Sequence, residues 1–159
     1  PMVQGAVEEV RRIQKDLRPS ILDDLGILAT VSWFCREFES TYPAIQIENQ
    51  VDIQENDVPD PLKIVIFRIS QEALNNIAKY SYANLVRFSL KHSDGRIHLS
   101  IDDDGVGFDV EEALSKEAST RGLGLSGMRE RTQFSGGTFR IESRKGEGTA
   151  IQATWQVDD

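Results

Sequence analysis

The sequence predicts an α+β fold, a two-layer sandwich of helices packed on one mixed sheet. Three observations favour this class. Alternating apolar segments are joined by short hairpin turns, amphipathic helical segments lie between them, and no glycine-rich turn joins the first strand to a helix as in doubly wound nucleotide-binding folds. With 159 residues, the chain is long enough for one domain with a substantial core.

The first segment has apolar residues at alternating steps of three and four, which places them on one stripe of a helix: Val3, Ala6, Val10, Ile13 and Leu17. Such a stripe is typical of a bundle or coiled-coil seam, and also of a helix that packs on its own domain. Pro19 predicts that this helix ends at Leu17 or Arg18. Residues 20–40 then predict a second helix, broken near Gly26.

A strand is predicted at residues 45–51, and an acidic loop with two prolines at 54–61 follows it. The strongest helical pattern covers residues 62–79. Its buried stripe is predicted to consist of Leu62, Ile66, Ile69, Ala73 and Ile77.

Two alternating strands, at 86–90 and 97–101, enclose Asp94-Gly95, which is a strong hairpin signal. Beyond residue 102 the chain is polar and glycine-rich, with a short helical pattern at 110–118 and a longer helix from about 125 to 134. Two final strands, at 138–143 and 149–157, complete the predicted sheet.

The formal net charge of -8 argues against broad contact with nucleic acid or an anionic membrane, since both need clustered Lys and Arg. Cys35 is the single cysteine, which excludes an intrachain disulfide and fits a reducing, cytoplasmic environment. No run approaches the roughly 18 apolar residues that span a bilayer. A membrane anchor elsewhere in the protein remains compatible with these observations.

Four polar residues share one face of the long helix, opposite its apolar stripe: Glu72, Asn75, Asn76 and Lys79. A carboxylate, two amides and an ammonium in this arrangement can hold phosphate oxygens and a divalent cation, because Mg²⁺ needs few protein ligands and keeps its waters. A solvated helix face is the alternative interpretation of the same residues.

The run Asp102-Asp103-Asp104-Gly105-Val106-Gly107 follows directly on a strand. Asp103 continues the inward alternation of that strand, so its carboxylate is predicted to point into the sandwich, where it needs a hydrogen-bond donor such as an adenine amino group. An acidic turn or a Ca²⁺ loop is the alternative, although the spaced oxygen ligands of an EF-hand are missing.

A third segment, residues 121–131 (Arg-Gly-Leu-Gly-Leu-Ser-Gly-Met-Arg-Glu-Arg), places glycines before a predicted helix start. The N-terminus of a helix is an anion site, because unpaired N–H groups and the positive end of the helix dipole lie there.

Residues 71–79, 103–107 and 122–128, in this order, resemble the N, G1 and G2 boxes of the Bergerat-fold ATPases and kinases, which include gyrase, Hsp90, MutL and the sensor histidine kinases. The segment from Gly122 to Arg131 and residues 17–26 look like the subfamily of nitrate sensors and the desaturase-regulating thermosensor. The resemblance covers nearly the whole chain. In place of the Lys-His-Ala common in this subfamily, Tyr80 and Ser81 follow Lys79, a difference that concerns fine positioning.

The resemblance implies that Asp103 binds the adenine amino group, Asn76 coordinates Mg²⁺ and Lys79 contacts phosphate. Thr149 looks like the threonine that supports Asp103. Glu72 corresponds to a water-activating carboxylate in the ATPases and, in kinases, to an aid that aligns the acceptor imidazole. The remaining implied ATP-pocket residues are Asn75, Gly105, Gly107, Phe108, Gly122, Leu123, Gly124 and Leu125, with a mobile lid at 109–121.

The implied reaction is transfer of the ATP γ-phosphoryl group to a histidine and then to a response-regulator aspartate. His92 and His98 are predicted in a hairpin turn and a strand, whereas the family's phosphoacceptor lies on a helix, so it is expected outside this chain and the chain alone should not label itself. Residues 1–18 then correspond to the end of the second helix of a dimerisation hairpin and residues 19–159 to the ATP-binding catalytic domain. The expected partners are ATP, that hairpin, a response regulator and a second copy in a homodimer.

Two other functions are compatible with the sequence. One is an ATP hydrolase of the gyrase or Hsp90 kind, in which Glu72 activates water. The other is an interaction module that keeps the fold without nucleotide. An anti-sigma Ser/Thr kinase is a further relative, which the segment 128–131 disfavours.

Overall fold

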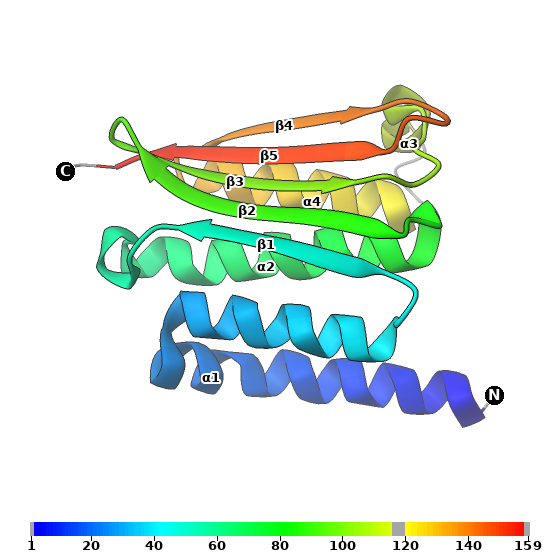
Figure 1. Ribbon diagram of the computed structural model, residues 1–159, viewed down its shortest axis with the longest axis horizontal. Helices are drawn as coiled ribbons and strands as arrows, with labels where there is room; N and C mark the ends of the chain where they lie inside the picture. The colour runs from blue at the N-terminus through cyan, green and yellow to red at the C-terminus, as the bar shows by residue number, and fades with distance from the viewer. Residues whose placement is uncertain (1, 116–119, 158–159) are drawn as a thin grey trace.

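A five-stranded mixed sheet forms one layer of the molecule, and helices cover one of its faces (Figure 1). The strands follow the order β1-β2-β3-β5-β4, with the bounds β1 Gln46–Asp52, β2 Leu85–Ser93, β3 Arg96–Asp103, β4 Thr138–Ser143 and β5 Thr149–Gln156. This computed structural model describes the backbone of residues 2–115 and 120–157, and the side chains of residues 20–115 and 121–157. The predicted two-layer α+β fold is confirmed.

β1 pairs with β2 in parallel, and the other three pairings are antiparallel. Asp94 and Gly95 form the two-residue connection between β2 and β3, with φ angles of 54° and 71°. Positive φ at both positions is what a tight hairpin turn requires, so the prediction from Asp-Gly is confirmed. The hairpin holds β2 and β3 at the centre of the sheet.

Helix α2 (Asp60–Asn76) packs its predicted apolar stripe into the core. All five stripe residues are buried, with exposed fractions between 0% and 7%. The helix continues as a five-residue π-helical turn, η2 (Ile77–Ser81), and Tyr82 then takes a left-handed conformation with φ 54°. Such π-turns occur often at functional sites. The largest fully buried side chains around α2 and the sheet include Trp155, Phe88, Ile27, Ile66, Ile69 and Leu74.

The first helix, α1 (Met2–Thr41), runs through Pro19, so the prediction that it ends at Leu17 or Arg18 is wrong. Proline removes one N–H donor, but its fixed φ near −65° is itself helical. The predicted break near Gly26 is correct: this residue has φ 82° and ψ 170°. Figure 1 shows that the chain reverses there, so that α1 consists of two arms lying side by side, the second of them next to α2.

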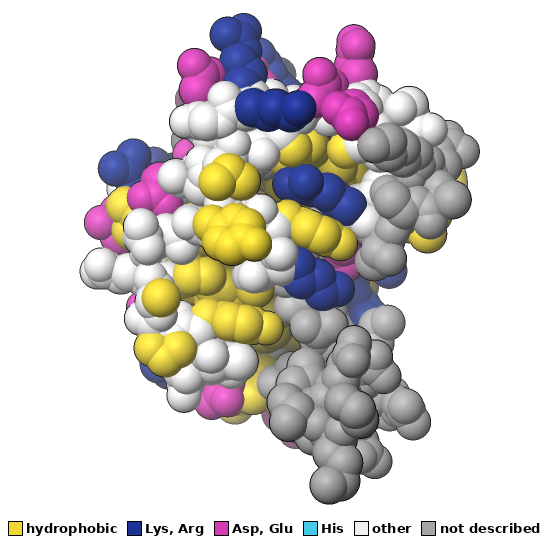
Figure 2. Space-filling view, turned by 90° about the vertical axis from the view of Figure 1, so that its right-hand side faces the viewer, with side chains coloured by type: hydrophobic (Ala, Val, Ile, Leu, Met, Phe, Trp, Pro, Cys, Tyr) yellow, Lys and Arg dark blue, Asp and Glu magenta, His cyan; other side chains and the backbone are white. Residues whose placement is uncertain are grey.

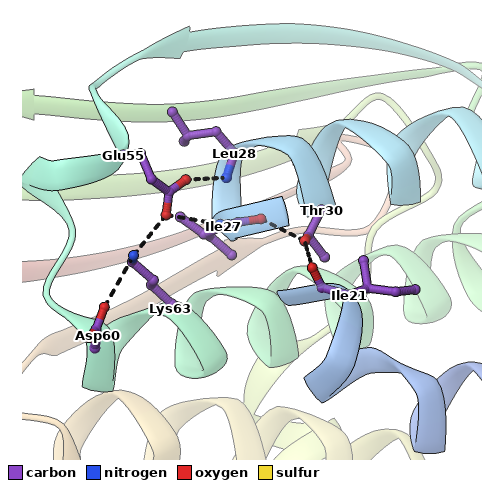
Figure 3. Close-up of polar contacts among 8 residues, drawn as sticks. Ile21, Ile27, Leu28, Thr30, Glu55, Asp60 and Lys63 are labelled. Carbon is purple, nitrogen blue, oxygen red and sulfur yellow. Dashed lines mark hydrogen bonds and ion pairs between the residues drawn. The ribbon is translucent and has the colours of Figure 1, made fainter. Parts of the chain in front are cut away.

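The break at Gly26 is held by Glu55, the first residue of the 3₁₀ turn η1 (Glu55–Asp57) (Figure 3). The Glu55 carboxylate accepts the backbone N–H groups of Ile27 and Leu28, at 3.1 Å each, and forms an ion pair with Lys63 at 2.9 Å. A Cβ atom at Gly26 would lie 2.6 Å from a carboxylate oxygen of Glu55. The missing side chain at this position therefore allows Glu55 to cap the second arm of α1.

Two further helices complete the layer: α3 (Val110–Ser115) and α4 (Thr120–Phe134). The sequence predicted the first of them at 110–118, and residues 116–118 lie outside the described residues. α4 covers the same face of the sheet as α2 and contacts that helix (Figure 1). None of the helices in the described part of the chain has the length and apolar character needed to cross a membrane.

Candidate functional site

The three motifs predicted from the sequence meet at one end of the sandwich, around a small cavity between α2, the sheet and α4. Six of the predicted site residues line it: Asn76, Asp103, Gly107, Phe108, Leu125 and Thr149. The rest of the lining is supplied by residues that the sequence did not single out: Ala73, Ile77, Ser81, Ile101, Arg121 and Ile151. The fold therefore brings together residues that lie far apart in the chain.

The three consecutive aspartates have different environments. Asp103 lines the cavity, and its Oδ1 accepts the N–H of Gly105 at 2.8 Å. Asp104 is exposed, and its Oδ1 accepts the N–H groups of Asn84 and Leu85, which lowers its pKa. Asp102 lies outside the cavity beside Ser100. Strand alternation thus puts only the middle carboxylate into the sandwich, as the sequence predicted.

Burial raises the pKa of Asp103, and the neighbouring carboxylates of Asp104 and Asp102 act in the same direction. The hydrogen bond from Gly105 and the charge of Arg121 oppose this shift without cancelling it. A carboxylate with a raised pKa in a concave site is typical of functional positions, because a structural role alone seldom justifies the cost of burying it.

The loop after β3, residues 104–109, packs against Ser81 on one side and Arg144 on the other. A Cβ atom at Gly105 would overlap the Ser81 carbonyl oxygen, and one at Gly107 would overlap the Arg144 carbonyl oxygen. Gly107 also has φ 65°, a conformation that other residues seldom adopt. Backbone packs directly on backbone at both glycines, and Gly107 lines the cavity.

Thr149 is held by a hydroxyl network that the sequence did not reveal. The Ser143 hydroxyl lies 2.7 Å from the Thr149 hydroxyl, accepts the N–H of Phe108 at 2.9 Å and lies 3.0 Å from the carbonyl oxygen of Gly148. Ser143 pairs directly with Thr149 between β4 and β5. Ser143 lies two residues after Ile141 on β4, on the same face of the strand. This alternation is the sequence pattern that could have identified Ser143 as a residue facing the sandwich.

The polar face of α2 is only partly directed into the cavity. Asn76 lines it, and its Nδ2 atom is buried and finds no hydrogen-bond partner among the described residues. Glu72 and Asn75 are half-buried and Lys79 is exposed, and none of these three belongs to the cavity lining. Lys79 lies one turn beyond Asn75, on η2.

The glycine segment corrects one prediction. α4 begins at Thr120 and not near 125, so Gly122, Leu123, Gly124 and Leu125 are helical and not a loop before a helix. Each glycine costs a helix about 1 kcal/mol relative to alanine. However, a Cβ atom at Gly124 would overlap the Glu72 carboxylate, so this glycine lets α4 lie close against α2. Leu125 is buried and Leu123 is 61% exposed.

Residues 62–159, which contain all three motifs, match the family described as histidine kinase-, DNA gyrase B-, and HSP90-like ATPase. The chain belongs to this family. It is therefore a nucleotide-binding domain of the Bergerat type, and relatives place it with the sensor histidine kinases, as the sequence predicted.

Among curated relatives, the oxygen sensor histidine kinase NreB of Staphylococcus carnosus (strain TM300) is 32% identical over 153 residues, which are 96% of this chain and 43% of NreB. The sensor histidine kinase MctS of Rhizobium johnstonii (strain DSM 114642 / LMG 32736 / 3841) is 33% identical over 156 residues, which are 95% of this chain and 32% of MctS. The chain thus spans less than half the length of either relative.

Solved histidine kinase structures share the fold. The histidine kinase domain of the blue-light activated kinase from Erythrobacter litoralis EL346 superposes with a TM-score of 0.68 at 19% identity, covering 82% of this chain and 61% of that one. The Acinetobacter baumannii histidine kinase AdeS gives a TM-score of 0.66 at 16% identity, covering 99% and 83%.

The cavity of this Bergerat-type domain is closed by Arg121, in the first turn of α4. The guanidinium carbon lies 3.8 Å from the ring centre of Phe108 and 4.6 Å from that of Tyr80. The remaining cavity volume is about 20 Å³, which is room for a water molecule and not for a purine. The predicted lid, 109–121, contains α3 and Arg121, and its residues 116–119 lie outside the described residues.

A larger groove, of about 660 Å³, adjoins the cavity between α3 and the β4–β5 hairpin and shares Asp103 and Thr149 with it. Three further carboxylates line this groove beside Arg144: Asp102, Glu142 and Glu147. Their negative charge makes the groove a poor place for phosphates. The predicted site residues Asn76 and Phe108 line the smaller cavity and not this groove.

The end of the molecule that contains the site carries apolar side chains in a band interrupted by Lys and Arg (Figure 2). Three large apolar residues are exposed on segments that reach this end: Tyr82 after η2, Val106 after β3 and Leu123 in α4. The two histidines lie elsewhere, on β2 and β3, and both are half-buried. The Nδ1 atom of His92 lies 3.7 Å from the Asp57 carboxylate.

Proposed function

We propose that this chain binds ATP with Mg²⁺ and transfers the γ-phosphoryl group to a histidine ring nitrogen in another segment of its protein. The observation that carries this proposal is the meeting of Asp103 and Asn76 in one cavity. A half-buried carboxylate and an amide whose buried Nδ2 atom has no partner among the described residues fit a polar ligand that offers both a donor and oxygen atoms.

In the proposed site, Asp103 recognises the adenine. Its Oδ1 is engaged by the N–H of Gly105, which leaves Oδ2 to accept a hydrogen bond from the amino group of the base. Phe108 and Leu125 are buried residues of the cavity lining and supply an apolar surface for the ring. Gly105 and Gly107 hold the wall of the pocket in place from behind.

Asn76 fits the role of a Mg²⁺ ligand. Its amide is buried at the cavity and its Nδ2 has no partner among the described residues, so its orientation is free to suit a ligand. No group of three or more His, Cys, Asp or Glu side chains in the described part of the chain is arranged to hold a metal ion. A cation here would need the phosphate oxygens as further ligands. When bound, Mg²⁺ would neutralise charge on the phosphates during transfer.

Lys79 and Glu72 act at the rim in this proposal. The exposed ammonium of Lys79 lies on the turn after Asn76 and is free to approach a phosphate that leaves the cavity. Glu72, one helical turn before Asn76, would orient the acceptor imidazole. The bond from the γ-phosphorus to the bridging oxygen breaks, a bond to the imidazole nitrogen forms, and ADP leaves. Positioning and charge neutralisation account for such transfers.

Residues 1–18 are proposed to be the end of a dimerisation helix and residues 19–159 the catalytic domain. The first arm of α1 supports this, because Figure 1 shows it next to the second arm and not on the sheet. The intact protein would then be a homodimer that phosphorylates its own helical hairpin and passes the phosphate to a response regulator. We place this activity on the cytoplasmic side, where ATP is available.

Calorimetric titration with ATP and ADP, with and without Mg²⁺, tests the binding part of this proposal. We expect micromolar affinity for the wild type and its loss in Asp103→Asn. Asp102→Asn is the matched control, since this neighbouring carboxylate lies outside the cavity. A wild type that binds no nucleotide, or an Asp103→Asn variant that binds as well as the wild type, would contradict the proposed site.

Phosphoryl transfer is tested by mixing the chain with a purified dimerisation hairpin and ATP. Acid-labile phosphohistidine on the hairpin supports the kinase, and its absence despite nucleotide binding counts against it. Steady release of phosphate by the chain alone, abolished in Glu72→Gln, would indicate an ATP hydrolase instead.

A further inference from the structure

The hydroxyl of Ser143 is in contact with three groups at the base end of the cavity. It accepts the N–H of Phe108 at 2.9 Å, and it lies 3.0 Å from the carbonyl oxygen of Gly148 and 2.7 Å from the hydroxyl of Thr149. The side chain is half-buried and also lines the larger groove beside the cavity. No role is assigned to Ser143 by the three sequence motifs.

A count of protons fixes the direction of these bonds. A serine hydroxyl has one hydrogen and two lone pairs, and the N–H of Phe108 uses one lone pair. The Gly148 carbonyl can only accept, so the hydrogen of Ser143 must point to it if that bond is made. Thr149 must then donate its own hydrogen to the second lone pair of Ser143. This is the one arrangement in which all three contacts are hydrogen bonds.

The consequence concerns Thr149, which pairs directly with Asp103 between β5 and β3 and lines the same cavity. With its hydrogen engaged by Ser143, Thr149 can present only lone pairs to a ligand. The carboxylate of Asp103 is an acceptor as well. Asp103 and Thr149 therefore both present acceptors, which suits the amino group of adenine and opposes the carbonyl oxygen that guanine has at the same position.

Resting on the proposed ATP site, we propose that Ser143 is a positioning residue that sets base specificity: it fixes the wall at Phe108 and orients the Thr149 hydroxyl so that its lone pairs, together with the Asp103 carboxylate, face the exocyclic group of the base. Ser143 itself does not line the small cavity, so it acts through these two neighbours. A purely structural role, in which Ser143 merely ties the β4–β5 turn to the loop after β3, would affect folding without affecting the choice of base.

The test measures dissociation constants for ATP, adenosine and GTP by calorimetry in the wild type, Ser143→Ala, Thr149→Val and the double variant. We expect Ser143→Ala to weaken ATP and adenosine binding by the same factor, about tenfold, which corresponds to one hydrogen bond. The ratio of the ATP to the GTP affinity should fall by a similar factor. In the Thr149→Val background, the same substitution should change this ratio less than about twofold, because the two residues act as a unit.

Ser135→Ala is the matched control. The Ser135 hydroxyl also has three polar contacts: it accepts the N–H of Trp155 Nε1, and its single hydrogen points to the neighbouring carbonyl oxygens of Arg131 and Thr132, but it lies at the other end of α4. Ser135→Ala should have a lower Tm than the wild type and should bind ATP, adenosine and GTP with unchanged affinities.

An unchanged ratio of ATP to GTP affinity in Ser143→Ala, or effects that simply add to those of Thr149→Val, overturns the positioning role. If Ser143→Ala does not fold, Ser143→Cys, which keeps a similar volume and forms weaker hydrogen bonds, undergoes the same comparison with the same criteria. A wild type that binds neither ATP nor adenosine refutes the proposed function itself. This result differs from one in which the wild type binds ATP and Ser143→Ala leaves the ratio of ATP to GTP affinity unchanged.

Discussion

Removal of the Glu55 side chain should loosen the break in α1. In the Glu55→Ala variant, the N–H groups of Ile27 and Leu28 lose their acceptor and Lys63 loses an ion-pair partner. Loss of a helix cap costs about 0.5–2 kcal/mol, and an ion pair with this partial exposure contributes about 0.2–1 kcal/mol. We therefore expect a decrease of about 2 kcal/mol in the free energy of unfolding. For a chain of this size, this corresponds to a Tm lower by about 4–8 °C.

The pH dependence gives a second observable. Burial by itself would raise the pKa of Glu55, but the hydrogen bonds from Leu28, Lys63 and Ile27 outweigh it, so the pKa lies below its ordinary value of 4.5. The lowered pKa adds stability that is fully present above pH 4.5 and is lost as the pH falls through the folded-state pKa. The difference in Tm between the wild type and Glu55→Ala should accordingly shrink below pH 4.5.

Thermal melts followed by circular dichroism between pH 3.5 and pH 8 measure both effects. Gly26→Ala provides the partner variant, because its Cβ atom would lie 2.6 Å from a Glu55 carboxylate oxygen and its φ of 82° is strained for alanine. The double variant should be more stable than the sum of the two single effects predicts, since each change disrupts the same contact. A Glu55→Ala melting curve within a degree of the wild type, or strict additivity with Gly26→Ala, would refute this account of the break.

Three other predictions follow from burial and contacts. Arg121→Ala should raise the affinity for adenosine several-fold in calorimetry, because it removes the guanidinium that closes the cavity over Phe108; an unchanged or lower adenosine affinity would contradict this. Burial raises the pKa of Cys35 to about 12, so a thiol reagent at pH 8 should label this residue only after unfolding. Stoichiometric labelling of the native protein would contradict the burial of Cys35. Ile69→Ala should lower the free energy of unfolding by about 2–5 kcal/mol in urea titration, whereas Tyr82→Ala, which truncates a side chain that is 87% exposed, should change it by less than about 0.5 kcal/mol; equal effects would contradict the burial pattern.

Local patterns were sufficient for much of the fold. The stripe of α2 follows from its 3.6-residue period, and the β2–β3 turn follows from Asp94-Gly95, because both depend on residues close together in the chain. The same holds for Asp103, since strand alternation alone distinguishes it from Asp102 and Asp104. The order of the three motifs further indicated the family, which residues 62–159 match.

Local rules were insufficient where a distant contact changes the balance. The proline rule predicted an end at Leu17 or Arg18, but α1 reverses at Gly26, where Glu55 binds the backbone N–H groups of Ile27 and Leu28 from 28 and 27 residues later in the chain. Glycines usually mark loops, yet Gly124 is helical and lies against the Glu72 carboxylate, which a Cβ atom there would displace. In both cases the approach of a second element determines the conformation.

The sequence by itself determined the fold class and the strand and long helix that carry the first two motifs. The residues of the adenine and phosphate sites stay predictions. The tertiary structure alone decided that Arg121 closes the cavity and that Ser143 joins Thr149 to Phe108. The physical reason is one of range. Periodicity and turn chemistry are properties of neighbouring residues, whereas a hydrogen bond between β4 and the loop after β3 exists only once the sheet has brought residues 108 and 143 together.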